Sequence, residues 1–429
     1  MNKAGKSNER VRLTFWRGLL WVGVLGMVGM ASIFLAATIF PSIGAQGADT
    51  LRSIIGDPAV AQMETWIFQV EDSFNQLKYN LGFEKPAAPW QLPTSPALIE
   101  TATLSPIPTL TDTVTPTSTP LPRSTPAPSS TSTQTATSTQ TATASPTPWQ
   151  PAAAHPLGTL AGEANWQAYI KDSKGKTVAY RTFLQPDPKR PYSLVAVVAF
   201  DLTRTRLNFI LGYNEPSLKG GPKGTGVIPP ADAMPNILLA TFNGGFKAEH
   251  GKYGAMSGGV VAIPPRENLA TVAIYKDGSV KIGSYGKEIT SLDDAIAWRQ
   301  NCSLVIDNGQ IDPLVNNDSA QYWGANLNGE TVIWRSGLGI SPDGKTLYYF
   351  AGSSLRMRAL AAAMLAVNVK SGLQLDINNY WVHFAAIRNT DGKAVPEPLF
   401  PAEMKNDRFH LSSRGLNPGW LCLFLTNAL

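Results

Sequence analysis

Three short segments place polar groups and glycines beside apolar, strand-like runs, an arrangement that can line a polar pocket. They are Asn243-Gly244-Gly245-Phe246, Arg335-Ser336-Gly337-Leu338-Gly339 and Leu375-Asp376-Ile377-Asn378-Asn379. In the last segment apolar and polar residues alternate, so a strand there is expected to carry Leu375 and Ile377 on one face and Asp376 on the other. The sequence therefore predicts a carboxylate and amides directed from the polar face of a strand into a shared site.

The glycine pair Gly244-Gly245 and the side chain of Arg335 are suited to an anionic ligand. Glycine adopts backbone angles that are closed to other residues, and amide N–H groups exposed at such a turn can bind phosphate. A guanidinium forms a planar fork that pairs with phosphate or carboxylate through two hydrogen bonds. The alternatives are an ordinary strand-ending turn for the glycines and a surface ion pair for Arg335.

Asp376 is the candidate for proton transfer. Burial among apolar neighbours raises the pKa of a carboxyl, which is the direction that a proton donor needs. With the amide of Asn378, the carboxylate could instead hold a divalent cation, whose identity is left open. An aspartate at a strand end is also common as a capping or turn residue. His250, in the polar loop after the glycines, and Trp381 are further candidates for contact with a substrate.

Eight apolar runs with strand character are expected to position these groups. They cover 194–200, 237–242, 260–263, 271–275, 303–306, 331–334, 346–351 and 373–377. Hairpin turns are predicted at Asp277-Gly278, Asn308-Gly309 and Pro342-Asp343-Gly344. Helices are predicted over 292–301, capped by Ser291, and over 355–369. Because strands outnumber helices and do not alternate with them regularly, we expect an α+β fold, a single domain with a mixed sheet and packed helices.

The N-terminal region predicts a membrane anchor. An apolar run over 19–40 carries no charge for 22 residues, which is long enough to span a bilayer. Five basic residues against one acidic residue precede the run, so residues 1–18 are expected in the cytoplasm and the rest of the chain outside the cell membrane. The alternative is a signal peptide cleaved after the small residues that end at Gly47.

Between the anchor and the folded domain, two further segments are expected. Residues 41–85 predict a juxtamembrane amphipathic helix that begins at Asp57-Pro58. Its apolar stripe within 58–80 would lie along the membrane, pair with a second copy of the chain, or pack on the C-terminal domain. Residues 86–155 are rich in Pro, Ser and Thr and predict a disordered, semi-stiff spacer. The folded domain is then expected over 156–429.

Composition and motif searches limit the function classes. The formal net charge of +5 is modest and no basic stripe interleaved with aromatic residues occurs, which argues against a nucleic-acid partner. Cys302 and Cys422 lack metal-type spacing; they could form a disulfide outside the cell or remain buried thiols. The sequence has no P-loop, no G-x-S-x-G elbow and no H-E-x-x-H pair.

The order of the motifs resembles the phosphodiester glycosidase family. The matching elements are Asn-Gly-Gly-Phe at 243–246, the Arg-x-Gly-x-Gly strand at 335–339, the Pro-Asp-Gly turn at 342–344, the helix over 355–369 and Leu-Asp at 375–376. The resemblance spans residues 241–384. It implies catalytic roles for Asn243, Arg335 and Asp376. It also places Gly244 and Gly245 in the active-site region. From their positions in and beside these segments, Phe246, His250, Gly337, Asn378 and Trp381 are further expected to bind substrate.

The chain departs from the family pattern directly after Asp376. Family members continue with glycine and serine, whereas this chain continues with Ile377, and bulky side chains there would occupy space that glycine leaves open. Two functions follow as hypotheses. One is a membrane-anchored extracytoplasmic hydrolase of sugar–phosphodiester bonds in envelope glycans or glycolipids. The other is a non-catalytic ectodomain that binds glycans or the cell envelope, with Trp323, Tyr380 and Trp381 as stacking surfaces.

Overall fold

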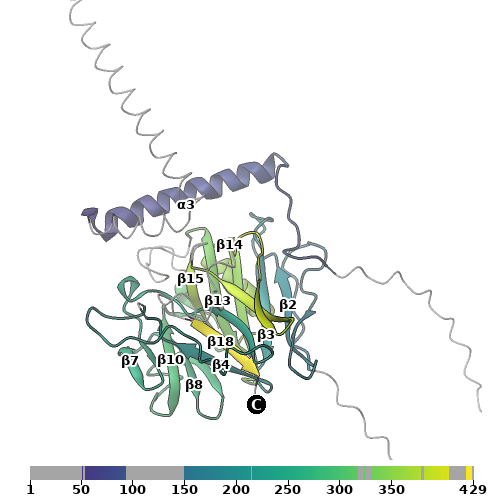
Figure 1. Ribbon diagram of the computed structural model, residues 1–429. Helices are drawn as coiled ribbons and strands as arrows, with labels where there is room; N and C mark the ends of the chain where they lie inside the picture. Colours follow the sequence, from purple (N-terminus) through teal and green to yellow (C-terminus); the bar gives the residue numbers. More distant parts are fainter. Residues whose placement is uncertain are drawn as a thin grey trace, which may run out of the picture. The chain divides into compact units, whose positions relative to one another are not determined.

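The structure is a computed structural model of the 429-residue chain. It describes residues 51, 54–92, 149–213, 215–316, 323, 330–377, 381–404 and 422–427. The chain divides into two compact units, of which one combines the chain up to Gln91 with the chain from Trp149 onward, and the other is Leu92–Pro148. All elements described below belong to the first unit (Figure 1).

The largest sheet has eight strands in the order β1-β2-β3-β14-β13-β15-β11-β12. These strands are β1 (Gln167–Lys171), β2 (Thr177–Leu184), β3 (Val195–Asp201), β11 (Leu304–Asp307), β12 (Gln310–Ile311), β13 (Ile333–Ile340), β14 (Thr346–Leu355) and β15 (Ser371–Ile377). All the neighbouring pairs are antiparallel. Strands β3 and β15 are buried along their whole length, so both faces of this sheet are covered by other parts of the protein.

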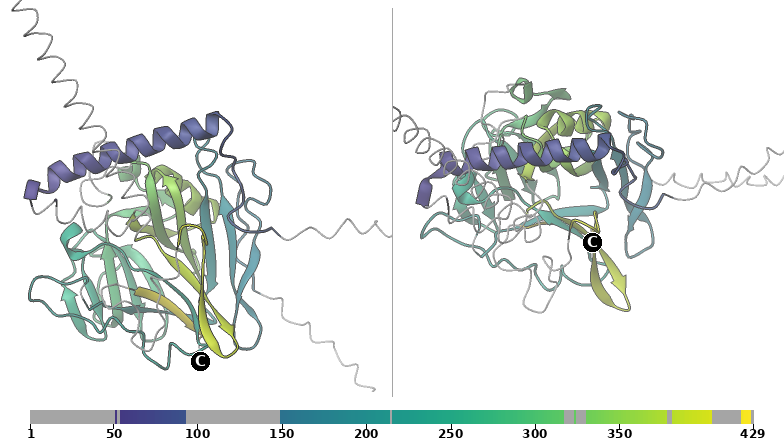
Figure 2. Two further views of the ribbon diagram at one scale, coloured as in Figure 1. Left: turned by 45° about the horizontal axis from the view of Figure 1, so that its top comes forward. Right: turned by 90° about the horizontal axis from the view of Figure 1, so that it is seen from above.

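Two five-stranded antiparallel sheets accompany it. One has the order β7-β6-β10-β8-β9 and is formed by β6 (Ala255–Ser257), β7 (Val260–Ile263), β8 (Ala270–Tyr275), β9 (Val280–Ser284) and β10 (Ala295–Asn301). The other has the order β17-β16-β5-β18-β4 and is formed by β4 (Thr205–Ile210), β5 (Leu238–Asn243), β16 (Phe384–Thr390), β17 (Lys393–Pro398) and β18 (Cys422–Asn427). Figure 2 shows the sheets from two further sides.

Helices are few among the described residues. They are α3 (Asp57–Asn80), α4 (Met357–Ala366) and the 3₁₀ helices η1 (Ala248–His250) and η2 (Pro313–Asn316). Two large hydrophobic clusters lie on opposite faces of the eight-stranded sheet. One joins Leu338 and Leu375 to residues of the five-stranded sheets such as Phe242, and the other joins Phe350 to α4. The catalytic candidates must therefore reach one of these two faces.

Most of the strand predictions are confirmed. Seven of the eight predicted runs match β3, β5, β7, β8, β11, β14 and β15, whereas the run predicted over 331–334 overlaps only the first two residues of β13. The three predicted turns join antiparallel hairpins, β8–β9, β11–β12 and β13–β14. The helix predicted over 355–369 is confirmed as α4, with shorter bounds. The described part of the chain is mostly β-sheet with few helices, and its strands form three antiparallel sheets where one mixed sheet was expected.

The helix predicted over 292–301 is wrong, because β10 occupies most of that segment. The expected cap, Ser291, does accept a hydrogen bond from the backbone N–H of Asp293 at 3.1 Å, but it closes a local turn and starts no helix. Strand β10 lies between β6 and β8, and its last five residues are all buried. Pairing on both sides therefore overrides the local preference for helix.

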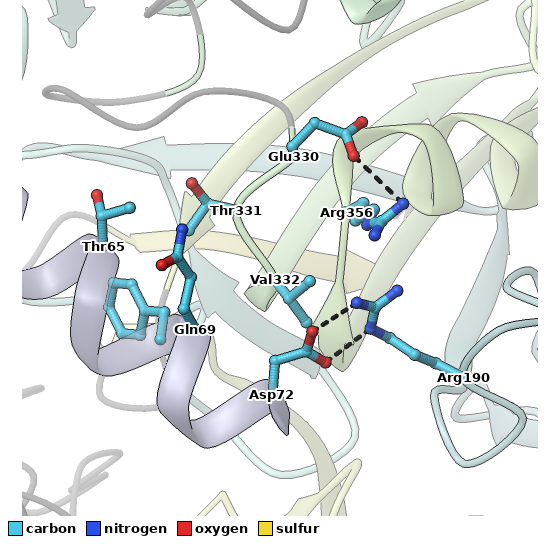
Figure 3. Close-up of a pocket in the computed structure, with 9 residues that line it drawn as sticks. Thr65, Gln69, Asp72, Arg190, Glu330, Thr331, Val332 and Arg356 are labelled. Carbon is cyan, nitrogen blue, oxygen red and sulfur yellow. Dashed lines mark hydrogen bonds and ion pairs between the residues drawn. The ribbon is translucent and has the colours of Figure 1, made fainter. Parts of the chain in front are cut away.

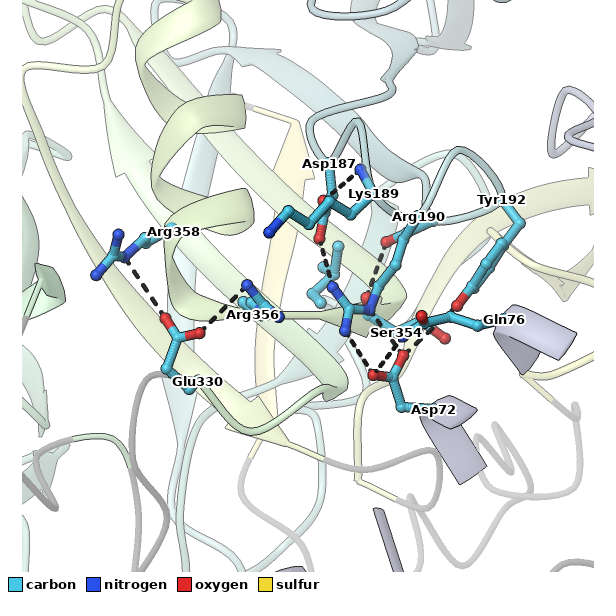
Figure 4. A network of polar contacts seen from close by, with 12 residues as sticks. Asp72, Gln76, Asp187, Lys189, Arg190, Tyr192, Glu330, Ser354, Arg356 and Arg358 are labelled. Atoms are coloured by element: carbon cyan, nitrogen blue, oxygen red, sulfur yellow. Dashed lines mark hydrogen bonds and ion pairs between the residues drawn. The ribbon is translucent and has the colours of Figure 1, made fainter. Parts of the chain in front are cut away.

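Helix α3 begins at Asp57 as predicted, although Gly56 takes the cap position. It packs on the folded domain through an ion pair in which the Arg190 guanidinium donates to both carboxylate oxygens of Asp72, at 2.7 and 2.5 Å. Tyr79 and Tyr192 add a ring contact with centroids 5.7 Å apart. Figure 4 shows how the loop carrying Asp187, Arg190 and Tyr192 meets the helix. One face of α3 therefore packs on the folded domain, which is one of the three arrangements expected for this helix.

Both ends of the segment 92–148 are fixed on strand β2. The Arg181 guanidinium lies 4.4 Å from the ring centre of Trp90, and Trp90 also contacts Phe183. On the far side of the segment, Trp149 contacts Tyr180 with ring centroids 5.6 Å apart. The segment therefore leaves and re-enters the same unit, which extends beyond the domain expected over 156–429 to include α3 and Trp149.

The expected anchor over 19–40 and the expected cleavage after residue 47 lie outside the described residues. Among the residues that the structure describes, no helix is both long and apolar enough to cross a membrane. Most of the expected spacer over 86–155 also lies outside the described part of the chain.

Candidate functional site

A β-bulge places Asp376 in the candidate site. The register between β13 and β15 changes between the pairs Arg335↔Ile377 and Gly337↔Gln374. Two residues, Leu375 and Asp376, therefore lie opposite the single residue Ser336. Such a bulge redirects the side chains that it contains. Leu375 and Asp376 consequently share the face toward the five-stranded sheets, where Leu375 joins the core with Phe242 and Asp376 meets Ser336.

The alternation predicted for this strand is wrong at its end for the same reason. Ile377 was expected beside Leu375, but it packs in the cluster that includes α4. The bulge is held from a neighbouring strand, since the side-chain amide of Asn301 donates to the backbone carbonyls of Gln374 and Leu375. Two adjacent backbone carbonyls at the bulge thereby share one side-chain donor.

Asn243, at the end of β5, meets Asp376 as predicted. Its Oδ1 accepts hydrogen bonds from the Tyr349 hydroxyl and from the backbone N–H of His383, both at 3.3 Å. Its Nδ2 lies 3.3 Å from Ser336 Oγ. Ser336 Oγ in turn accepts from the backbone N–H of Asp376 at 3.1 Å. The amide of Asn243 is thereby fixed with its donor group toward the carboxyl of Asp376, to which it also hydrogen bonds.

The Asp376 carboxyl is set to change its protonation near neutral pH. Burial raises its pKa from 3.8 to about 7, because a charged carboxylate loses solvation in the protein interior. Several groups oppose this effect without cancelling it: the backbone N–H of Ile377, which donates to Oδ1 at 2.8 Å, the charges of Arg299 and Lys247, and the amide of Asn243. A carboxyl with such a pKa can both accept and donate a proton under physiological conditions.

Arg299 is the buried cation of the site, and the sequence did not indicate it. Its guanidinium donates to the carbonyls of Gly244 at 3.2 Å, Tyr253 at 2.7 Å, Gly254 at 3.2 Å and Phe246. Burial lowers its pKa to about 10, while the charge of Asp376 acts in the opposite direction. Arg299 therefore remains charged at neutral pH. It fixes the backbone of the double-glycine loop and holds positive potential close to Asp376.

Lys247 is the more accessible cation, with 19% of its side chain exposed. It lies at the end of the loop and its charge lowers the pKa of Asp376. Its ammonium group lies 4.8 Å from the ring centre of Trp381. Glu215 accepts a hydrogen bond from the backbone N–H of Ala248 at 2.8 Å, and burial raises its pKa. The carboxyls of Asp376 and Glu215, which both have raised pKa values, thus lie near the charges of Arg299 and Lys247.

Arg335 does not join Asp376, contrary to the prediction. Its guanidinium donates to the carbonyls of Leu355 and Thr331 at 3.0 and 2.9 Å and to Gln374 Oε1 at 2.5 Å. Consecutive residues of a strand point to opposite faces, so Arg335 extends toward the α4 side while Ser336 faces Asp376. Burial lowers the pKa of Arg335 to about 10. Arg335 is thus a buried structural cation on the wrong face to hold the predicted phosphate beside Asp376.

The other predicted residues fall into two groups. One lies in or near the double-glycine loop or outside the described residues, and the other is buried in the hydrophobic core. Gly244 and Gly245 lie in the loop held by Arg299, and Gly245 uses a positive φ of 103° beside Asn301. His250 lies on η1 and pairs with Glu249 at 3.5 Å. Asn378 and Tyr380 lie outside the described residues. The positions of these residues do not test whether they contact a substrate.

Three residues that were predicted to contact a substrate or glycan instead take part in packing the hydrophobic core. Phe246 is 3% exposed and packs against Tyr253. Gly337 makes room for α4, since a Cβ there would lie 2.5 Å from Met364 Cε. Trp323 is fully buried and offers no stacking surface. In each case an aromatic or glycine near the motif serves packing, which sequence alone does not distinguish from binding.

No metal site appears among the described residues, where no three His, Cys, Asp or Glu side chains group together. Cys302 is a free, buried thiol whose sulfur lies 3.4 Å from the Tyr253 hydroxyl; burial raises its pKa to about 11. The buried-thiol alternative therefore holds for Cys302, and no disulfide joins it to Cys422. The side chain of Cys422 lies outside the described part of the chain.

A separate cavity of about 230 Å³ lies between α3 and the body of the unit (Figure 3). Charged residues of both signs line it. They form two ion pairs, Arg190 with Asp72 and Arg356 with Glu330, the second at 3.2 Å. Its floor includes Thr331, whose carbonyl binds Arg335. This cavity does not contain Asp376, and its paired charges leave no net charge to select a ligand.

The chain is distantly similar in structure to solved proteins. The catalytic domain of zebrafish N-acetylglucosamine-1-phosphodiester α-N-acetylglucosaminidase has 16% identity and a TM-score of 0.37, covering 61% of this chain and 87% of that chain. A hypothetical protein from Synechocystis has 9% identity and a TM-score of 0.37, covering 62% of this chain and 65% of that chain. No protein-family model matches the chain, and no curated protein matches its sequence.

Proposed function

We propose that the folded domain is a hydrolase that cleaves a sugar–phosphodiester bond, with Asp376 as the proton-transferring residue. The observation that carries the proposal is the carboxyl of Asp376, which a bulge and Asn243 hold in place and whose pKa is about 7. Perturbed pKa values of this kind are concentrated at functional sites. The motif order that resembles phosphodiester glycosidases supplies the substrate class, and Lys247 and Arg299 supply the positive charge that an anionic substrate requires.

In the proposed step, a water molecule attacks the anomeric carbon of the sugar. Asp376 in its ionised form accepts a proton from that water as the new carbon–oxygen bond forms. The bond from the anomeric carbon to the phosphate oxygen breaks, and the phosphate monoester departs with the bonding electron pair. Lys247 and the field of Arg299 stabilise the negative charge of the departing group. Asp376 then returns its proton to solvent, which restores the carboxylate.

The activity test uses the full chain in detergent with a UDP-sugar and with synthetic sugar-1-phosphodiesters. We expect release of free sugar from at least one phosphodiester substrate, and no release from a neutral glycoside of the same sugar, because Lys247 and Arg299 would stabilise a departing phosphate and not a neutral leaving group. The Asp376→Asn variant should show no release. A folded protein that turns over none of the phosphodiesters would contradict the proposal.

Lys247 gives a second prediction, on pH dependence. Its positive charge lowers the pKa of Asp376, so Lys247→Gln should raise that pKa. Because the ionised carboxylate is the active form, the rise of kcat/KM with pH should move to higher pH in the variant. We also expect kcat/KM at pH 7 to fall by about 10-fold or more, as one charge contact with the departing phosphate is lost. An unshifted pH profile would remove Lys247 from the site.

The alternative function is glycan binding without catalysis. The observation that favours it is the Lys247–Trp381 stack, a cation 4.8 Å from a half-buried aromatic ring, which resembles the aromatic platforms that bind sugars. In that case Asp376→Asn should leave glycan-array binding unchanged, while Trp381→Ala should abolish it. Binding without product formation by the unchanged chain would select this function.

We further propose that the run over 19–40 anchors the protein in the cell membrane, with residues 1–18 in the cytoplasm and the folded domain outside. The uncharged length of the run and the basic residues before it support this placement. Envelope glycans and glycolipid phosphates would then be the accessible substrates.

A further inference from the structure

Helix α3 presents its apolar side outward. Its domain-facing side carries the polar residues Thr65, Gln69 and Asp72 at the cavity, and among them Phe68, which packs against the hydrophobic core. The opposite side carries a row of exposed apolar residues, called here the outer stripe: Met63, Trp66, Val70, Phe74, Leu77 and Leu81, each between 39% and 61% exposed. This arrangement is the reverse of an ordinary surface helix, whose apolar stripe faces the core.

The outer stripe runs straight along the helix. Its intervals of three, four, four, three and four residues advance 18 residues from Met63 to Leu81, which is five turns of about 3.6 residues. The helix cannot roll to bury the stripe while Arg190 grips Asp72 through two hydrogen bonds and Tyr79 contacts Tyr192. The stripe is therefore held away from the domain by contacts on the other side of the same helix, of which Figure 4 shows those of Asp72.

We infer that the outer stripe lies on the surface of a lipid bilayer. The uncharged run over 19–40 ends 16 residues before Asp57, and 16 residues extend to at most about 55 Å. If that run spans the membrane, α3 begins within this distance of the lipid. The apolar surface also continues toward the run, since Ile54 and Ile55 are 71% and 47% exposed. Trp66, in the stripe, has the amphipathic ring that favours the membrane–water interface.

The nearness of the uncharged run over 19–40 favours lipid over a second copy of the chain as the occupant of the stripe. Glu64 and Glu71 follow the same edge of α3, and Lys78 is the single basic residue of the helix. Lys78 follows Glu71 by seven residues and therefore shares this edge with the two glutamates, so the edge carries both signs of charge and a helix pair remains an outcome of the test. A bilayer of neutral lipid leaves these carboxylates in water at its surface. The domain would then rest against the membrane through α3, and the segment 92–148 would not separate them.

The test places the photoreactive analogue p-benzoylphenylalanine at single positions of the full chain, reconstituted in phosphatidylcholine vesicles. Phe74 lies in the stripe, and the exposed Gln62 lies about a third of a turn from Phe74 around the helix. After irradiation, we expect mass spectrometry to find lipid adducts at position 74 at least five times more often than at position 62. Val70→Glu, placed in the stripe, should reduce the adducts at position 74 while the chain still floats with the vesicles.

Each other outcome overturns the inference. Crosslinked dimers at position 74 would identify a second copy as the occupant, and an internal adduct with residues 19–40 would identify the chain's own apolar run. An absence of lipid adducts at position 74 would show that the stripe does not face the bilayer. A chain that does not float with the vesicles is not anchored in their membrane, and in that case the inference also fails. None of these outcomes depends on turnover, so the proposed catalytic function is tested separately.

Discussion

Replacing Asp376 by asparagine should make the protein more stable at pH 8 while it abolishes the proposed activity. The folded state raises the pKa of Asp376 from 3.8 to about 7, so it binds this proton more tightly than the unfolded chain does. The corresponding stability is fully present below about pH 4 and is lost as pH rises through about 7. At pH 8 the buried charge costs on the order of 4 kcal/mol, and the neutral amide removes that cost.

The measurement is chemical unfolding of both proteins at pH 4 and pH 8. The difference between variant and parent should be small at pH 4 and several kcal/mol in favour of the variant at pH 8. Asp72→Asn is the matched control with the opposite sign, because hydrogen bonding to Arg190 lowers the pKa of Asp72, so that variant should lose stability at pH 8. Equal stability of Asp376→Asn and the parent at both pH values would show that the carboxyl is not buried as described.

Replacing Arg299 by glutamine should cost about 3–5 kcal/mol of unfolding free energy and should also raise the pKa of Asp376. The stability loss follows because four backbone carbonyls lose their donor. The pKa change follows because the charge of Arg299 lowers the pKa of Asp376. The acid side of the pH–activity profile should therefore move to higher pH. Arg299→Lys keeps the charge and provides a folded variant if the glutamine variant does not fold.

Arg335→Gln is the control for this experiment. Arg335 is as deeply buried as Arg299, and its pKa is likewise lowered to about 10, but it faces α4 on the other side of β13. We expect a comparable loss of stability without movement of the pH profile. If the Arg335 variant shifts the profile and the Arg299 variant does not, the two arginines have been assigned to the wrong faces.

The sequence predicted the parts of this fold that local signals determine. Strands with short glycine turns, such as β13 and β14 around Asp343-Gly344, carry their pattern within about 20 residues. The convergence of Asn243 and Asp376 was also predictable, because both end apolar runs with polar side chains. Strand β10 was not predictable in this way, since its alanines and its preceding serine favour a helix and its partners β6 and β8 are supplied only by the folded sheet.

The errors at the site follow from two features that one sequence does not display. The bulge opposite Ser336 reverses the side-chain alternation of β15, and no residue of the run marks it. Arg299 lay within the segment assigned to a helix, so its approach to Gly244 could not be foreseen. The sequence indicated Arg335 as the cation of the site, because Arg335 precedes a glycine motif. Strand geometry, which sends Arg335 and Ser336 to opposite faces, then decides against it.

The contacts of Trp90 and Trp149 with β2 have a consequence for limited proteolysis. A protease that cuts once within 92–148 divides the chain but frees neither piece, since Arg190 still holds Asp72 and both tryptophans remain in place. Denaturing electrophoresis would then show two fragments where gel filtration shows one particle. Separation of the two fragments would require conditions that dissociate α3 and Trp90 from the rest of the unit.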